Sequence, residues 1–293
     1  MTRTPKKILL ATDLSCRCDR ALDRTVALAA EWGARLLVVH ALETPLAVTD
    51  APSWRRPTDA RRVAERRIRA DLRDVTDVEL EVVVERGEPS ALVLEVADRL
   101  GCDLIATGVA RDETLGRILL GRTVETVVRR SQVPVLVVKS RPRGPYRRVM
   151  VASDFSETSR KALLTALGMF PRSHVALFHA FDVPFETCVD DKMAAREAFA
   201  NEARREAEAF LASMPSPAAR GVPIHCEYGS PTSLLRAMME EMTVDLVVCG
   251  TRGRSRAVEL LVGSVAQALL TGLPGDVLVV PRAHEAGELH RAS

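Results

Sequence analysis

A glycine motif near the carboxyl end of the chain has the residue types and spacing of a phosphate-binding loop. Gly250-Thr-Arg-Gly253 is followed, after nine residues, by Gly263-Ser264. Glycine lets the backbone turn through positive φ and approach a ligand closely. A helix that begins at Ser264 would add free N–H groups and a hydroxyl for an anion. The same glycines could form only a loop and a helix cap, and a short motif alone does not decide between the two.

An altered copy of this motif lies earlier in the chain, and the spacing indicates a tandem duplication. Four pairs of residues are each 142 positions apart: Gly87 and Gly229, Asp103 and Asp245, Gly108 and Gly250, and Gly121 and Gly263. At 293 residues the chain has the length of two domains, which we place at residues 1–143 and 144–293. The Pro- and Gly-containing segment Ser140–Pro145 is the predicted connector.

Each half alternates strands with helices. Predicted strands are Lys7–Ala11, Arg35–His40, Glu79–Val84, Asp103–Thr107 and Val135–Val138, then Arg148–Ala152, His174–His179, Pro223–Glu227, Val244–Cys249 and Val277–Val280. Predicted helices are Cys16–Trp32, Thr58–Asp74, Pro89–Leu100 and Arg122–Arg130, then Glu157–Met169, Lys192–Met214, Pro231–Met242 and Ser264–Leu270. Aliphatic strands without alternation indicate parallel sheets covered on both faces. The predicted fold is α/β, with two tandem doubly wound domains and ligand sites at the carboxyl ends of the strands.

The composition disfavours several classes of protein. A net charge of +2 and an aromatic content of 4% argue against a nucleic-acid-binding surface. No apolar run reaches the ~20 residues of a membrane helix, and the first residues lack a signal-peptide pattern, so we expect no membrane contact and a cytoplasmic location. Six cysteines without a CxxC pair make a metal site unexpected. Cys16 and Cys18 could be a redox pair, but we favour ordinary helix residues.

Three segments of the second half resemble the universal stress protein family. They are Val149–Ser156, Phe178-His-Ala180 and the Gly-x2-Gly-x9-Gly-Ser motif, and the resemblance extends over both halves. It implies, in each half, a five-stranded parallel sheet in the order 3-2-1-4-5 flanked by helices. Family members with the glycine motif bind ATP and members without it do not. The resemblance therefore implies ATP as the ligand, with or without Mg²⁺.

The resemblance also implies which residues of the second half contact the nucleotide. Asp154 would hold the adenosine portion, and the Ala180 backbone would meet the adenine edge. The glycine loop would wrap the ribose and phosphates, and the helix after it would donate to the phosphate chain. The implied set is Ala152, Ser153, Asp154, Ala180, Cys249, Gly250, Arg252, Gly253, Gly263, Ser264 and Val265. The residue types agree, because a carboxylate accepts hydrogen bonds from hydroxyl and amino groups and free N–H groups bind anions.

The first half departs from this pattern at two positions. Arg111 stands where the second half has Gly253, and Arg122 stands where it has Ser264. These arginines could block the phosphate space, or they could supply charge to a nucleotide or another anion. We favour a site that has lost nucleotide binding, because charge does not replace the backbone freedom of glycine.

No combination of residues predicts catalysis. The chain has no HExxH motif, no Ser/His/Asp order and no paired carboxylates at a catalytic spacing. His40 and His179 end the second strand of each half, and we interpret them as buried, hydrogen-bonded residues rather than general bases. The leading hypothesis is a regulatory module in stress adaptation that binds ATP in its second half, forms a homodimer and acts on an unidentified partner protein. The alternatives are a nucleotide-independent interaction scaffold and a slow nucleotide hydrolase or transferase.

Overall fold

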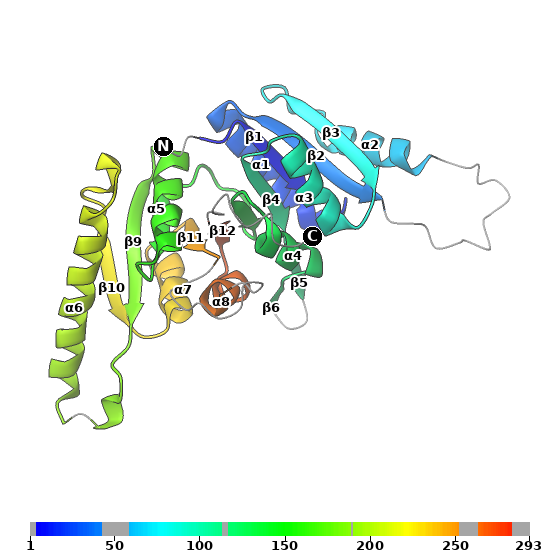
Figure 1. Cartoon of the computed structure of the whole chain (residues 1–293). Helices are drawn as coiled ribbons and strands as arrows, with labels where there is room; N and C mark the ends of the chain where they lie inside the picture. The colour runs from blue at the N-terminus through cyan, green and yellow to red at the C-terminus, as the bar shows by residue number, and fades with distance from the viewer. Residues whose placement is uncertain (1–3, 43–58, 113–116, 189, 252–262, 283–293) are drawn as a thin grey trace, which may run out of the picture. The chain divides into compact units, whose positions relative to one another are not determined.

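The chain divides into two units, one for each half of the sequence repeat. The computed structural model describes residues 4–42, 59–112, 117–188, 190–251 and 263–282 (Figure 1). One unit runs from Pro5 to Pro145, and the other contains the residues from Tyr146 onward together with Thr4. Both are α/β structures built on a parallel sheet, as the alternation of strands and helices in the sequence predicts.

The first unit has the predicted sheet, with strand order β3-β2-β1-β4-β7. The strands are β1 (Lys7–Ala11), β2 (Arg35–Leu42), β3 (Leu80–Arg86), β4 (Leu104–Gly108) and β7 (Val135–Val138). The helices are α1 (Asp19–Trp32), α2 (Ala60–Asp71), α3 (Pro89–Arg99) and α4 (Arg122–Arg130). A hairpin of β5 (Ala110–Asp112) and β6 (Arg117–Leu119) was not predicted, because three-residue strands are too short to give a periodic signal.

The start of α1 differs from the prediction. The expected helix Cys16–Trp32 begins with a 3₁₀ turn, η1 (Cys16–Cys18), and the regular helix starts only at Asp19. The Ser15 hydroxyl donates to Asp13 (Oγ to Oδ1, 2.6 Å) and makes no capping hydrogen bond to a helical N–H group. Because Ser15 is engaged in this way, the first turn lacks the side-chain cap that a regular helix start favours.

The second unit repeats the sheet, with strand order β10-β9-β8-β11-β12. The strands are β8 (Arg148–Ala152), β9 (His174–Phe181), β10 (Ile224–Tyr228), β11 (Leu246–Gly250) and β12 (Asp276–Val280). The helices are α5 (Glu157–Met169), α6 (Lys192–Ala212), α7 (Pro231–Glu241) and α8 (Ser264–Gly272), with 3₁₀ turns η2 (Glu186–Cys188) and η3 (Pro217–Ala219). Among the described residues of both units, no helix is long and apolar enough to cross a membrane.

Aliphatic strands form the core of each unit. Every residue of β4, β7 and β12 is buried, which is the pattern of parallel strands covered on both faces. In the second unit α5 packs on β8 and β11, and α7 packs against α8. Strands β8 and β11 are parallel neighbours, so their carboxyl ends lie at the same edge of the sheet.

Tyr146 joins the start of the second unit to its last strand, and we expect Tyr146→Phe to destabilise that unit. Its side chain is 3% exposed, and its hydroxyl donates to Oδ2 of the fully buried Asp276 at 2.6 Å. Removing one donor from a buried carboxylate costs about 1–3 kcal/mol. Differential scanning calorimetry should show a lower unfolding midpoint. In the control Tyr228→Phe, the lost hydrogen bond goes to Glu186 at a less buried position, so the loss should be smaller. An unchanged midpoint for Tyr146→Phe would contradict this account.

Candidate functional site

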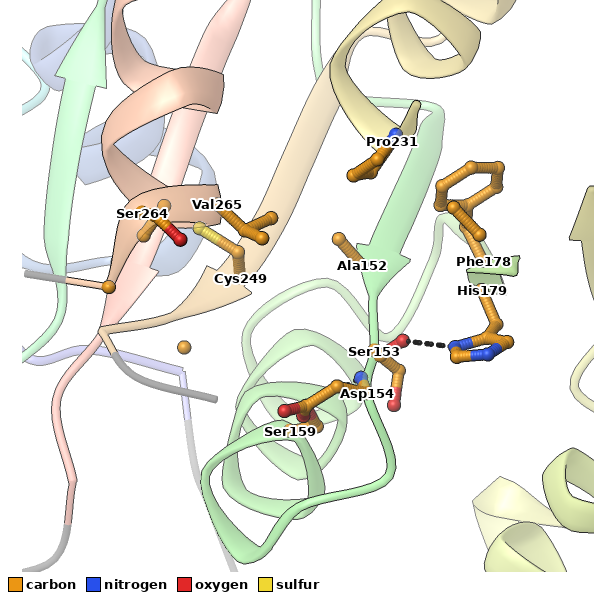
Figure 2. Close-up of a pocket in the computed structure, with 14 residues that line it drawn as sticks. Ala152, Ser153, Asp154, Ser159, Phe178, His179, Pro231, Cys249, Ser264 and Val265 are labelled. Atoms are coloured by element: carbon orange, nitrogen blue, oxygen red, sulfur yellow. Dashed lines mark hydrogen bonds between the residues drawn. The ribbon is translucent and has the colours of Figure 1, made fainter. Parts of the chain in front are cut away.

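A cavity of about 280 Å³ lies at the carboxyl ends of β8 and β11 in the second unit. Nine of the eleven predicted site residues line it: Ala152, Ser153, Asp154, Ala180, Cys249, Gly250, Gly263, Ser264 and Val265. The other two, Arg252 and Gly253, lie outside the described residues. The sequence analysis did not place five further lining residues in the site: Ser159, Phe178, His179, Pro231 and Ala266 (Figure 2). Their positions depend on how the helices pack on the strands, although Pro231 carries the signal of a helix start.

A tight turn holds the Asp154 carboxylate at the end of β8. Its Oδ1 accepts from the Ser159 hydroxyl at 2.6 Å and from the Ser156 N–H group at 3.1 Å. The turn passes through Phe155 at a φ of +61°, a left-handed conformation that costs free energy for a residue other than glycine. Leu14 has the same conformation in the first unit, with a φ of +60°. Asp154 therefore stabilises a strained turn, a role that the sequence analysis did not predict.

Two helices of the second unit begin at the cavity. Helix α8 starts at Ser264, and its N-cap residue Gly263 has no side chain to bond the first N–H groups. The N-cap residue of α7, Ser230, makes no side-chain hydrogen bond to its helix, and Pro231 lines the cavity. The first N–H groups of a helix lack partners within it, and the helix dipole adds positive potential there. The cavity is therefore suited to an anion.

Much of the remaining cavity wall is apolar. Phe178 is almost fully buried and lies beside Ala152 and Pro231, and Val265 is 48% exposed at the start of α8 (Figure 2). Carbon-rich walls of this kind bury flat ring systems, whereas the helix N-termini would hold a charged group. The cavity thus offers both an apolar wall for a ring system and helix N-termini for an anion.

His179 has a structural contact in the wall of this cavity. Its Nδ1 lies 2.8 Å from the carbonyl oxygen of Ser153 (Figure 2). Its ring lies tilted against the ring of Phe155, with centroids 4.4 Å apart. Because a carbonyl only accepts hydrogen bonds, Nδ1 carries the proton in this contact. His40 makes the same bond to the Thr12 carbonyl at 2.9 Å. Both histidines are hydrogen-bonded as predicted, although they are half-buried rather than fully buried.

The two described glycines of the motif do not adopt the positive-φ backbone conformation that the sequence analysis expected. Neither Gly250 nor Gly263 has a positive φ, so that part of the sequence interpretation is wrong. At Gly250 the reason for glycine is packing, because an added Cβ would overlap the methyl group of Thr158 and lie 3.1 Å from its Cβ. Gly108 in the first unit is similarly close to the 3₁₀ helix η1, where an added Cβ would lie 2.7 Å from the Arg17 carbonyl oxygen. These two glycines let a helix approach its strand.

Gly250→Ala should therefore destabilise the second unit even without any ligand. The added methyl group would push Thr158 on α5 away from β11, and overpacking of this kind costs about 1–3 kcal/mol. Thermal unfolding of Gly250→Ala and of the double variant Gly250→Ala/Thr158→Ala would test the cause. The double variant should recover most of the loss, because the clashing methyl group is gone. Equal stability of the two variants would indicate that Gly250 is not required for packing against α5.

The first unit builds the same turn with a thiol in place of one hydroxyl. Asp13 Oδ1 accepts from the Ser15 N–H group at 2.9 Å, from the Ser15 hydroxyl and from Cys18 Sγ at 3.2 Å. Partial desolvation raises the pKa of Asp13, but these hydrogen bonds outweigh it and the net pKa is lowered. Burial, with the Asp13 charge as a further cause, raises the pKa of Cys18 to about 11. A thiol protonated at neutral pH supports the structural interpretation of Cys18 over a redox pair with Cys16.

The first unit also carries a charged pair where the second unit has two serines. The Glu88 carboxylate caps α3 by accepting from the N–H groups of Ser90 at 3.1 Å and Ala91 at 2.8 Å. Arg122 begins α4 and is close enough to contribute to the lowered pKa of Glu88. At the repeat spacing of 142 these positions correspond to Ser230 and Ser264. The Glu88 carboxylate thus occupies the N-terminus of α3, the helix of the first unit that is equivalent to α7. A comparison of the two repeats in the sequence could have revealed this difference.

The lowered pKa of Glu88 predicts a pH-dependent contribution to stability. Its main cause is the hydrogen bond from the Ser90 hydroxyl, followed by the N–H groups of Ala91 and Ser90. A carboxyl whose pKa falls on folding stabilises the folded state above its unfolded pKa, and this is lost as the pH drops through the folded pKa. Glu88→Gln should therefore unfold at a lower temperature than wild type at pH 7, and the difference should vanish on acidification. Glu95→Gln, on the exposed face of α3, is the control, and a Glu88→Gln difference independent of pH would contradict the capping role.

The comparison with known proteins agrees with this architecture. The sequence profile described as the Universal stress protein family matches residues 4–139 and 145–281. The chain belongs to the universal stress protein family. A protein from Thermus aquaticus, described as a universal stress protein in the QAH/OAS sulfhydrylase 3' region, is 33% identical over 135 residues, which are 46% of this chain and 98% of that relative.

Solved structures show the same fold along the whole chain. A universal stress protein from Archaeoglobus fulgidus matches with a TM-score of 0.63 and 20% identity, over 94% of this chain and 98% of that one. A functionally unknown protein from Pseudomonas aeruginosa matches with a TM-score of 0.68 and 16% identity, over 95% and 93% of the two chains. At these identities the similarity is one of fold, so the function of the cavity is argued from its own residues.

Proposed function

We propose that the second unit, residues 144–293, binds one molecule of ATP, with or without Mg²⁺, in the cavity at the ends of β8 and β11. The observation that carries the proposal is that two helix N-termini without side-chain caps and an apolar wall meet in one cavity of about 280 Å³. The phosphates would lie at the N-termini, and the adenine would pack on the apolar wall.

The proposed contacts follow from the groups that each residue offers. The Asp154 carboxylate would accept from the ribose hydroxyls, and the Ala180 backbone would pair with the adenine edge. The hydroxyl of Ser264 and the N–H groups at the start of α8 would bind the phosphates. Arg252 and Gly253 complete the proposed set from the loop after β11, alongside Ala152, Ser153, Cys249, Gly250, Gly263 and Val265. These are recognition roles, and the proposed function is binding rather than catalysis.

In this proposal the first unit, residues 1–143, is a degenerate site. Glu88 already satisfies the N–H groups of α3, and its negative charge would repel a phosphate at that position. Arg122 replaces the small hydroxyl of Ser264, and Arg111 lies in β5 at the place that corresponds to Gly253. We therefore propose one nucleotide per chain. Its presence would bias the binding of a partner protein in a cytoplasmic stress response, with the chain acting as a homodimer.

Calorimetric titration of ATP, with and without Mg²⁺, would test the proposal. We expect one site per chain, and at least about tenfold weaker binding in Ser264→Arg, which introduces the residue of the first unit and removes a hydrogen bond to a charged group. The matched control, Arg122→Ser, changes the equivalent position of the first unit and should leave the affinity unchanged. Circular dichroism would verify that both variants are folded.

Three other results would each require a different change to the proposed function. Two sites per chain would show that Arg111 and Arg122 are tolerated and that the first unit is not degenerate. No heat of binding, together with no nucleotide released on denaturation, would favour a nucleotide-independent scaffold. Phosphate release above a control without protein, lost in Asp154→Asn, would favour a hydrolase.

A further inference from the structure

The N-terminal half of α6 and the loop before it carry apolar side chains that the unit itself does not cover. Phe185 is 84% exposed, Met193 is 81% exposed and Phe199 is 41% exposed. The buried residues of α6 all lie in its C-terminal half, from Ala203 onward. In Figure 1 the N-terminal half of α6 extends beyond the arrowheads of β9 and β10. We call Phe185, Met193 and Phe199 the α6 surface.

An ion pair holds the loop and the helix of the α6 surface together. Arg196 Nε lies 2.5 Å from Glu186 Oε1, and the Tyr228 hydroxyl donates to Glu186 Oε2 at 2.7 Å. The Arg196 guanidinium also lies 4.2 Å from the centre of the Tyr228 ring. Glu186 follows Phe185 directly, and Arg196 is three positions from both other residues of the surface. Phe185 has a φ of +55°, a left-handed backbone conformation that costs free energy for a residue other than glycine. The neighbouring contacts must therefore stabilise the exposed position of Phe185.

The charge around the α6 surface is negative, and the corresponding helix of the first unit is positive. Residues 182–202 contain six acidic and two basic side chains, a net charge of −4. Helix α2 occupies the equivalent place after the second strand, and its residues 60–71 contain five arginines and two acidic residues, a net charge of +3. Among its exposed residues is Val63, which is 46% exposed between arginines. The loop before α6 and the N-terminal half of α6 thus carry a net charge opposite to that of α2.

We propose that the α6 surface binds helix α2 of a second copy of this chain. Among the described residues six large apolar side chains are exposed, and four of them are Val63 of α2 and the three residues of the α6 surface. Val63 would enter the apolar surface while the arginines of α2 face the acidic rim. In a two-fold dimer each copy supplies one α2 and one α6 surface, so the contact occurs twice. The proposal rests on these surfaces and not on the nucleotide site.

Sedimentation equilibrium tests whether these surfaces hold a dimer together. We expect wild type to dimerise, and we expect Phe185→Ser and Arg66→Glu/Arg67→Glu each to raise the dissociation constant at least about tenfold, since buried aromatic and arginine side chains dominate such interfaces. Met242→Ser, which removes an apolar side chain that is 42% exposed and lies outside both surfaces, should have no effect. A monomeric wild type, or a dimer that none of these changes weakens, would overturn the proposal.

A charge exchange between two variants would identify the pairing itself. Arg66→Glu/Arg67→Glu changes the net charge of residues 60–71 from +3 to −1, and Asp190→Lys/Glu197→Lys/Glu202→Lys changes that of residues 182–202 from −4 to +2. Each variant alone should be weakened, because like charges then face each other across the contact. Their equimolar mixture should form a dimer close to wild-type affinity, because both contacts between the two variants again join opposite charges. Failure of the mixture to recover association would overturn the pairing of α2 with α6, and circular dichroism would establish that each variant is folded.

Discussion

The candidate site depends on the parallel pairing of β8 with β11. Leu246 pairs with Val149 and Val248 with Val151, so the two strands run side by side to the same edge of the sheet. The turn with Asp154 and the end of β11 at Gly250 therefore open onto one cavity. Parallel strands must be joined by crossover helices, and these crossovers also bring the N-termini of α7 and α8 to that edge. The topology creates the cavity, and the side chains then determine which ligand fits it.

The two units show how little of the backbone has to change for the site to change character. Both have the same strand order, the same left-handed residue after the aspartate and the same histidine bond to the end of the first strand. What differs is the charge at the helix N-termini, where Glu88 and Arg122 stand in place of Ser230 and Ser264. The same fold therefore allows a helix N-terminus either with or without a side-chain cap. The residues at these positions, and not the fold, determine which ligand can bind.

The sequence predicted the strands and helices to within a few residues, because aliphatic runs and helix caps are local signals. It did not predict the 3₁₀ turn at Cys16–Cys18, which results from the Ser15 hydroxyl bonding Asp13. It named nine residues that line the cavity, but it explained the glycines by a need for positive φ. The actual constraint at Gly250 is contact with Thr158 on another element, and such contacts are absent from a local pattern. Phe178 and Pro231 were missed for the same reason.

A short chain of contacts joins the cavity of the second unit to the α6 surface. Ala180 lines the cavity, and the next residue, Phe181, packs edge-on against Tyr228 with ring centroids 6.0 Å apart. Tyr228 in turn bonds Glu186, which holds the loop of Phe185 against Arg196. A ligand that fixes the end of β9 would restrict the residues that present the α6 surface, so nucleotide binding and association would be coupled. By linkage such coupling is reciprocal, and association would strengthen nucleotide binding by the same factor.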